Sequence, residues 1–404
     1  MLIKLALRNI FRNRRRSLLT LLVLTFGGTA LIMFGGYKEI SFHGVRENTI
    51  RNSLGHLQIY KRGFLGSESQ RPLEYGLEKY DRLRKAIERD PRVEMTAAQI
   101  TLMGLVTNGD KSETFLATAV EPSKDRNMAA QIIKSGEFLS DKEEDGVIVG
   151  ELLAKSMKVK PGDYLTLMTT SVHRSLNGMD VKVLGTFTTG VKEYDERAIK
   201  MPLVAAQRLM HTEKIEKLLV LLKHTEDTQA VKADLRKMVA REGLDVEMRD
   251  WFELATFYHQ VVALYNGIFG FLGLVVFVIV ILSVSNTVMM SILERTREIG
   301  TLLAMGTLRR RVWLMFLTEG VMVGVLGGAL GLGVGSGLAT LINHASIQLP
   351  PPPGYTMGYL LRIMLTPSVL VTTLVLSIVT ATLSSVLPAV KASRLNIVRA
   401  LGHV

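Results

Sequence analysis

The charged residues best placed to bind another protein form a compact segment, Glu294 to Glu298, between two apolar stretches of the chain. Glu294, Arg295, Arg297 and Glu298 bring both signs of charge together within one turn of sequence. A charged turn held between apolar runs is poorly suited to catalysis. It is well suited to docking onto a soluble partner through complementary charge. The segment therefore predicts a binding element rather than an active site.

Motifs that would support catalysis are missing from the sequence. No GxxxxGK[ST] phosphate loop occurs; the stretch from Gly150 to Ser156 is one residue too short and has Ala154 where the loop needs glycine. There is no HExxH, and no two of the eight histidines have convincing metal-ligand spacing. The absence of cysteine excludes disulfides, thiolate zinc sites and cysteine nucleophiles. We therefore expect no enzyme, metal or cofactor site in this chain.

Four apolar segments are long enough to cross a membrane, which takes about 20 residues. The hydrophobic content is 48%, yet 21% of residues are charged, a mixture that fits membrane spans joined to a large water-exposed domain. We predict a membrane protein with one span, a large α+β extracytoplasmic domain and then three clustered spans. The predicted spans are residues 17–37, 261–293, 312–342 and 367–390.

Basic residues flank these spans on one side, which is the positive-inside pattern of membrane proteins. They place residues 1–16, 294–311 and 391–404 in the cytoplasm and residues 38–260 and 343–366 outside. The net charge of +12 does not indicate nucleic-acid binding, because the basic groups lie beside the spans and lack interleaved aromatics. The basic residues are Lys4, Arg8, Arg12, Arg14, Arg15, Arg16, Arg295, Arg297, Arg309, Arg310, Arg311, Lys391, Arg394 and Arg399.

The first span has a second interpretation as a signal peptide, because it follows a basic segment and contains small residues. Its apolar run is longer than the usual core of a signal peptide, about 7–15 residues, so we expect an uncleaved anchor.

The segment between the first two spans has the mixed periodicity of an α+β domain. Residues 37–54 and 250–266 are predicted to extend the adjoining spans as helical stalks, and amphipathic helices on the membrane surface are the alternative. Residues 77–90 and 230–242 are further predicted helices. The predicted strands are residues 114–120, 147–149, 164–168 and 181–188.

The third span is rich in glycine, which lets helix backbones approach closely in lipid. We expect these glycines to pack helices and to allow one helix to slide on another. Glu319, at the start of the run, is either a functional carboxylate or an interfacial anchor. The predicted packing glycines are Gly320, Gly324, Gly327, Gly328 and Gly331, and the run continues through Gly333, Gly335 and Gly337.

Several local motifs are similar to those of the MacB/FtsX/LolC-LolE class of ABC transporter permeases, and the resemblance covers the whole chain. The segment from Asn286 to Gly306, including Ile299 and Gly300, resembles the coupling helix of that class. Glu319-Gly320 and its following glycines also match. Departures are Asn396 and Glu121, where the class often has proline and aspartate. Further matches are residues 388–395 and 399–401, and, in the outer domain, residues 135–139, 147–150 and 159–163.

The resemblance implies a type VII, mechanotransmission mechanism in a bacterial inner membrane. Two permeases, identical copies or paralogues, would pair, each bound to a separate ABC ATPase that holds ATP and Mg. The coupling residues would be Glu294, Arg295, Arg297, Glu298, Ile299 and Gly300. A periplasmic adaptor or chaperone is a possible further partner. Lipoprotein release is the first expected role; the alternatives are MacB-like export of a drug, peptide or siderophore and FtsX-like regulation of cell-wall hydrolases.

Overall fold

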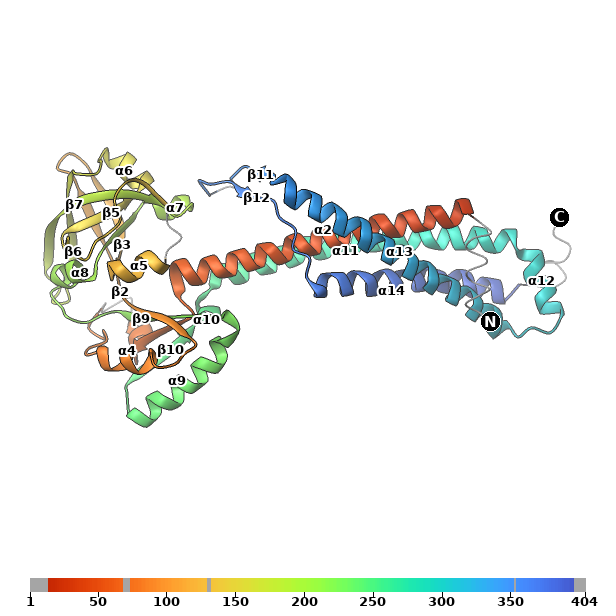
Figure 1. Ribbon diagram of the computed structural model, residues 1–404, viewed down its shortest axis with the longest axis horizontal. Coiled ribbons are helices and arrows are strands. Elements are labelled where there is room, and N and C mark those ends of the chain that lie inside the picture. The colour runs from red at the N-terminus through yellow and green to blue at the C-terminus, as the bar shows by residue number, and fades with distance from the viewer. Residues whose placement is uncertain (1–13, 68–72, 129–131, 352–353, 396–404) are drawn as a thin grey trace. The chain divides into compact units, whose positions relative to one another are not determined.

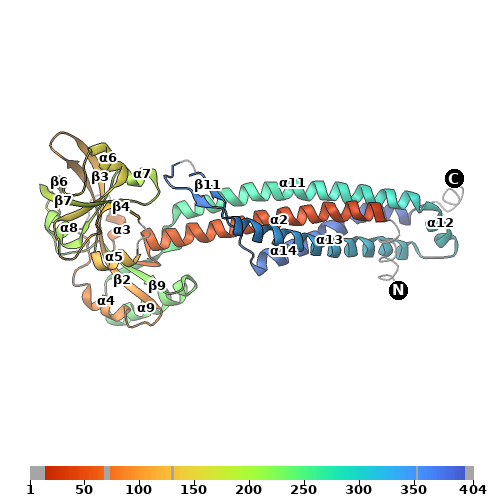
Figure 2. The same cartoon turned by 45° about the horizontal axis from the view of Figure 1, so that its top comes forward.

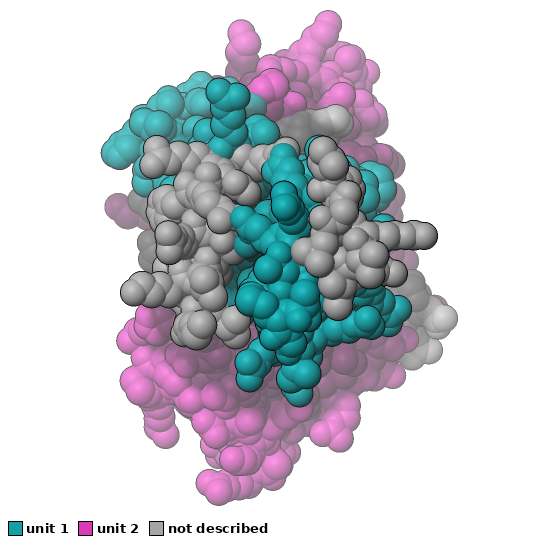
Figure 3. Space-filling model, turned by 90° about the vertical axis from the view of Figure 1, so that its right-hand side faces the viewer, with its two compact units in different colours: residues 1–43, 260–349, 360–404 teal, residues 44–259, 350–359 magenta. Residues whose placement is uncertain are grey.

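The computed structural model describes residues 14–67, 73–128, 132–351 and 354–395 (Figure 1). The predicted features at Lys4, Arg8, Arg12, Asn396 and residues 399–401 lie outside these ranges. The chain divides into two compact units, coloured separately in Figure 3. A helical unit comprises residues 1–43, 260–349 and 360–404, and a mixed unit comprises residues 44–259 and 350–359.

Four long apolar helices form the helical unit, and each is long enough to cross a membrane. The prediction of one span followed by three is confirmed, and the four helices run alongside one another in both ribbon views (Figures 1 and 2). The short α12, Thr296–Ala304, lies between the second and third. The long helices are α2 Arg14–Thr49, α11 Thr256–Glu294, α13 Arg309–Ala345 and α14 Pro367–Ser393.

Local sequence explains where these helices begin and end. Thr366 caps α14 by accepting a hydrogen bond from the Val369 amide, and Pro367 occupies the first helical position, where a missing N–H costs nothing. After α12 the chain turns at Gly306, whose φ of 87° favours glycine. Asn343, near the end of α13, bonds both the amide and the carbonyl of Ile363.

The mixed unit is built on a twisted sheet that confirms the predicted α+β class. In the described residues the strand order is β10-β1-β9-β2-β3-β8-β5-β7-β4, with β6 pairing β2 and β7. The strands are β1 Leu57–Lys61, β2 Val93–Thr107, β3 Ser112–Val120, β4 Ile132–Gly136, β5 Gly146–Gly150, β6 Tyr164–Thr170, β7 Leu176–Thr188, β8 Ala198–Pro202, β9 Lys217–Leu222 and β10 Val246–Asp250.

Several helices cover this sheet, and the apolar core lies between the two layers. Figure 1 shows α4 and α9 beside β9 and β10, and α6 and α8 beside β5, β6 and β7. Short helices join the strands. The helices are η1 Ile50–Leu54, α3 Phe64–Ser67, α4 Asp81–Ile87, α5 Pro122–Met128, α6 Glu151–Met157, α7 Lys192–Asp195, α8 Leu203–Met210, η2 Thr225–Asp227, α9 Thr228–Glu242 and α10 Trp251–Leu254.

Strands β3, β5, β6 and β7 and helix α9 confirm their predicted segments. The predicted helix over residues 77–90 is wrong at its start. Leu77 instead forms a β-bridge with Ile215, and α4 begins only at Asp81. Leu77 is apolar because it is buried in the core through this bridge, and not because it lies on the helix.

The connection between α13 and α14 contributes residues to the mixed unit. It contains the two-residue strands β11 Gln348–Leu349 and β12 Tyr359–Leu360. Tyr355 bridges Val191, the Thr356 amide donates to the Gly190 carbonyl at 2.8 Å, and the Lys192 amide donates to the Gly354 carbonyl at 2.9 Å. The sequence predicts a short external loop over residues 343–366, and no pattern in it indicates that residues 354–356 pair with residues 190–192.

Candidate functional site

The charged segment predicted as a binding element, Glu294 to Glu298, spans the end of α11 and the start of α12, and the predicted coupling residues continue to Gly300. Glu294, Arg297 and Glu298 are exposed, whereas Arg295, Ile299 and Gly300 are buried. One half of the predicted set therefore forms an accessible charged face, and the other half faces the interior of the helical unit.

The buried face of α12 is anchored in an apolar cluster. Ile299 and Leu303 pack there with residues from the end of α11, the start of α13 and the end of α14. Because one small cluster joins α12 to three long helices, a displacement of α12 must be shared with them. The buried members are Ile292, Ile299, Leu303, Val312, Met315, Phe316, Ala389 and Ala392.

Hydrogen bonds fix both ends of α12. At its start, the Thr296 hydroxyl donates to the carbonyls of Ile292 and Leu293, at 3.2 and 2.8 Å. At its end, the Thr307 amide donates to the Leu302 carbonyl at 3.0 Å. The helix is therefore held as a firm element and not as a loose loop.

Arg295 connects α12 to α13. Its Nε lies 3.2 Å from Glu298 Oε2, and its Nη1 lies 3.7 Å from Glu319 Oε2. Its guanidinium carbon is 5.9 Å from the centre of the Phe316 ring, within reach of a cation–π interaction. The sequence placed Arg295 with the docking charges and considered Glu319 separately, because residue order alone does not reveal that they pair.

The accessible face of α12 is accompanied by basic residues. Arg309, Arg310 and Arg311 begin α13 and are exposed, as are Lys391 and Arg394 at the end of α14. The positive charge that the sequence assigned to the cytoplasmic side thus lies on the helix ends that adjoin α12.

The glycines of α13 make close contacts with α2 and α14. A methyl group added at Gly324 would lie 2.8 Å from Ile378 Cα, and one added at Gly331 would lie 3.2 Å from Gly28 Cα. Added methyls at Gly327 and Gly328 would meet Leu24 on α2 and Leu374 on α14, at 2.6 and 3.0 Å. Gly320 faces the Ser385 side chain. All five predicted packing glycines thus face a neighbouring helix.

Gly333 and Gly337, in the same glycine run, have no described atom within 4 Å of an added methyl. The glycine run therefore contains packed and open positions that the sequence could not separate.

An apolar patch lies on the mixed unit. Met103 and Leu105 on β2 are 73% and 46% exposed, and Leu176 on β7 is 77% exposed. Leu105 pairs with Met168 on β6, and Leu176 pairs with Thr170 two residues further along β6. Side chains in register on adjacent strands share a face, so these residues form one apolar surface, here named the β2–β7 patch. No pattern in the sequence predicted this patch.

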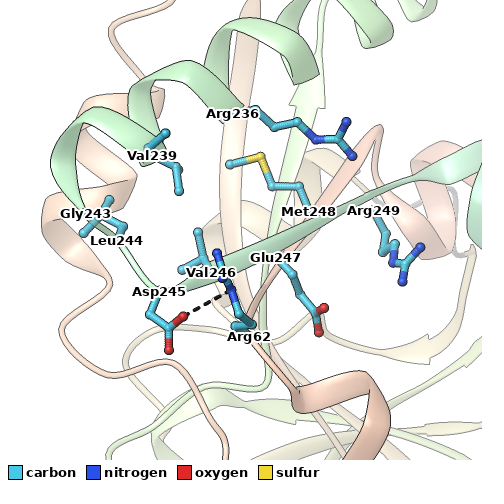
Figure 4. A pocket seen from close by; sticks show the side chains of 11 residues that line it. Arg62, Arg236, Val239, Gly243, Leu244, Asp245, Val246, Glu247, Met248 and Arg249 are labelled. Atoms are coloured by element: carbon cyan, nitrogen blue, oxygen red, sulfur yellow. Dashed lines mark ion pairs between the residues drawn. The ribbon is translucent and has the colours of Figure 1, made fainter.

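A separate groove of about 770 Å³ lies between α9 and the edge strand β10 (Figure 4). Arg62, Arg236 and Arg249 line it together with Asp245 and Glu247, and Arg62 Nε lies 3.2 Å from Asp245 Oδ1. These mixed charges give the groove no single polarity, and none of the predicted site residues lies there.

Known proteins resemble the chain over both units. A family model described as MacB-like periplasmic core domain matches residues 17–238, and one described as FtsX-like permease C-terminal matches residues 270–397. The ABC transporter permease YtrF of Bacillus subtilis is 24% identical over 98% of this chain and 97% of its own length. The macrolide export ATP-binding/permease protein MacB of Brucella abortus is 35% identical over 28% of this chain and 16% of its own length. The crystal structure of the periplasmic region of MacB from Actinobacillus actinomycetemcomitans is 12% identical, with a TM-score of 0.38, and the match covers 50% of this chain and 92% of that one.

Proposed function

Because this chain belongs to the MacB- and FtsX-like family of ABC transporter permeases, we propose that it couples ATP hydrolysis by a separate ATPase subunit to movement of a hydrophobic substrate. The movement takes place on the extracytoplasmic side of a bacterial inner membrane. ATP and Mg bind to the ATPase, since this sequence has no phosphate loop. Release of lipoproteins from the membrane is the first candidate for the role.

The observation that carries the proposal is the division of α12 into two faces. Glu294, Arg297 and Glu298 offer mixed charge to a partner, and Ile299 and Leu303 fix the helix to the ends of the spans. A partner that pushes on the charged face therefore moves the apolar cluster, and with it α13 and α14. This is the arrangement that a coupling helix needs.

The β2–β7 patch supports a hydrophobic substrate. Met103, Leu105 and Leu176 expose apolar surface in water, and such patches on soluble domains mark interaction sites. Acyl chains of a lipoprotein would fit this surface by chemistry, as would an apolar drug or peptide. Export of a drug, peptide or siderophore is therefore the alternative transport role. Regulation of a cell-wall hydrolase is the alternative in which a protein partner covers the patch.

A second permease, an identical copy or a paralogue, is also part of the proposal. Helix α11 exposes most of its apolar surface, and added methyls at Gly267, Gly270 and Gly273 meet no described atom within 4 Å. Small residues on an apolar membrane helix allow a second helix to approach closely. Pairing through this surface would give the transporter two coupling helices for two ATPase subunits.

Charge reversal on α12 tests the proposal. We expect Glu298→Arg to lower recovery of the permease–ATPase complex, because juxtaposed like charges at an interface cost several kcal/mol. Expression and insertion should stay normal, because the Glu298 side chain is half exposed, and an arginine in its place can turn away from Arg295 into water. The measurement is co-purification of the ATPase and its hydrolysis rate for wild type and variant in the same detergent.

A matched control is Asp141→Arg, which reverses an exposed acidic side chain in the mixed unit. It should leave complex recovery and ATPase rate unchanged. If Glu298→Arg behaves like Asp141→Arg, α12 does not dock the ATPase and the proposed function loses its central step.

A further inference from the structure

A largely buried ion pair and a small cavity occur together where α12 joins the spans. Arg295 is only 9% exposed, and it reaches Glu319 on α13 at 3.7 Å and Glu298 on α12 at 3.2 Å. Arg295 lies between the end of α11 and the start of α12, so its backbone moves when the angle between these helices changes.

The cavity lies beside Glu319 and has a volume of about 40 Å³, which is room for about one water molecule. All four long helices line it, with hydroxyl groups set among apolar side chains. An ionised carboxylate only accepts hydrogen bonds, so it needs hydroxyls that can donate to it. Ser17 and Ser291 can do so, whereas the hydroxyls of Thr287 and Ser385 donate to carbonyls of their own helices. The polar lining is Ser17 and Thr20 of α2, Thr287 and Ser291 of α11, Glu319 of α13 and Ser385 of α14.

Stability alone does not account for charges in this position. Taking two charges out of water costs several kcal/mol per ion, and apolar residues of similar volume often serve as well or better. Ionisable groups within membrane helices generally mark a functional pathway. The best attested use of a buried ion pair is to fix one arrangement of elements or to distinguish two.

We propose that the Arg295–Glu319 ion pair is the link through which displacement of α12 is transmitted to α13, with the hydroxyl-lined cavity as the alternative position of the Glu319 carboxylate. In the arrangement described here, the pair holds α13 in register with α12. When an ATPase tilts α12, Arg295 withdraws, Glu319 turns to the hydroxyl groups, and α13 shifts along its glycine contacts with α2 and α14. This inference rests on the proposed function, because the displacement comes from the ATPase.

The acidic residues of α12 and α13 therefore have different roles. Glu298 lies on the exposed face, whereas Glu319 is enclosed by the spans. A change at Glu298 should weaken ATPase binding. A change at Glu319 should leave binding intact and interrupt transmission. Glu319 is thus a positioning residue, and its effect has to be measured downstream of binding.

The test uses the full chain with its ATPase, reconstituted in lipid. The chain has no cysteine, so His344→Cys at the outer end of α13, an exposed position, takes a single environment-sensitive fluorophore. In this background we expect Glu319→Gln to recover the ATPase complex at the wild-type level. The ATP-dependent fluorescence change should fall about tenfold, within the range of typical coupling between sites. Glu319→Asp should retain part of the change.

A second variant distinguishes loss of the link from a folding defect. Arg295→Met combined with Glu319→Leu replaces the pair with apolar side chains of similar size and should fold normally. It too should bind the ATPase and lose the fluorescence change. A fluorescence change within twofold of wild type in Glu319→Gln, or in the double variant, would overturn the link. If His344→Cys with Arg295 and Glu319 unsubstituted shows no ATP-dependent fluorescence change, the result instead overturns the proposed function itself, together with the link that depends on it.

Discussion

The helical unit and the mixed unit satisfy their buried polar groups in different ways. In α14 the hydroxyls of Ser377, Thr380, Ser384 and Ser385 each donate to a carbonyl one turn earlier in the same helix. In the mixed unit, Lys232 of α9 reaches Asp250 at the end of β10, which joins two elements. Of the described buried side chains that carry charge, Arg295 is in the helical unit. The others are Asp195, Lys200, Glu216, Lys232 and Asp250 in the mixed unit.

This difference shows how one chain is built for two solvents. Lipid provides little hydrophobic driving force between helices, so close packing of small residues decides how spans fit together. Hydroxyls bonded within their own helix do not tie it to its neighbours, and the helix can shift. In water, burial of an apolar core stabilises the fold and can accommodate ion pairs that lock one element to another. The helical unit is therefore suited to movement and the mixed unit to rigidity.

Loss of the Lys232 charge should have the largest effect on stability. Its Nζ lies 2.8 Å from both Asp250 Oδ2 and Glu253 Oε1, and the side chains of Lys232 and Asp250 are each 4% exposed. Lys232→Met leaves Asp250 as a buried charge with a lost partner, which costs about 3–5 kcal/mol. Urea unfolding of the mixed unit can be followed by Trp251 fluorescence in a Trp313→Phe background, since the chain has two tryptophans.

Lys237→Met is the control on the same helix. Lys237 is exposed and lies 3.8 Å from the exposed Asp234, so its loss should cost at most about 1 kcal/mol. Equal effects of the two variants would contradict the view that the mixed unit depends on buried ion pairs. The pKa of Asp250 gives a second readout. Burial raises it, but hydrogen bonds from Lys232 and Gln229 outweigh burial and hold it below its usual value. It should rise in Lys232→Met.

Acidification should destabilise the mixed unit through His56. This side chain is buried where η1 meets β1; its Nδ1 accepts a hydrogen bond from the Leu222 amide, and its Nε2 lies 3.0 Å from the Thr225 hydroxyl. Burial is the main reason that its pKa is lowered to about 4, and Arg51 lowers it further, against the opposing effect of Glu47. The unfolded chain therefore binds this proton near pH 6.5 and the folded chain only near pH 4.

Since the unfolded state binds more protons between these values, the contribution is complete above about pH 6.5 and is lost as the pH falls toward 4. The loss is at most about 3 kcal/mol. Urea unfolding at several pH values, again followed at Trp251, measures the slope. His56→Gln should remove that part of the slope, whereas His224→Gln, at an exposed position, should keep it. An unchanged slope in His56→Gln would exclude His56 as its source.

Local patterns in the sequence predicted what depends on local chemistry. Four spans follow from runs of apolar residues, and β3, β5, β6 and β7 follow from short β-rich runs between turn residues. Strand β1 was missed because it is placed by pairing with β9 and β10, far along the chain. The bridge between Val191 and Tyr355 was missed for the same reason.

The site shows the same limit. Charge and spacing identified α12, and the glycine run identified the packed span. Burial of Arg295 depends on Glu319 and Phe316 of the next helix, so the sequence assigned it to the surface with its neighbours. Glycine spacing likewise could not distinguish Gly331, which faces Gly28, from Gly333, which has open space.

The same contrast between packed and open glycines leads to the smallest predicted effect, on the helical unit. Gly324→Ala adds a methyl 2.8 Å from Ile378 Cα and 3.0 Å from Ala381 Cβ, so the backbone of α14 must move. Overpacking of this kind costs about 1–3 kcal/mol. Gly333→Ala adds the same methyl to the same helix with no described atom within 4 Å, and alanine favours helix over glycine by about 1 kcal/mol in water.

Denaturation in detergent, followed by Trp313 fluorescence in a Trp251→Phe background, compares the stability of the two variants. We expect Gly324→Ala to be less stable than the unsubstituted chain and Gly333→Ala to be equal or more stable. Because the added atoms are identical, a difference between the variants measures only the contact with α14. If both variants match the unsubstituted chain, the glycine contacts do not hold α13 against α14. Close packing of small residues would then not be what fits the helical unit together, and its contrast with the mixed unit, which buried ion pairs stabilise, would not hold.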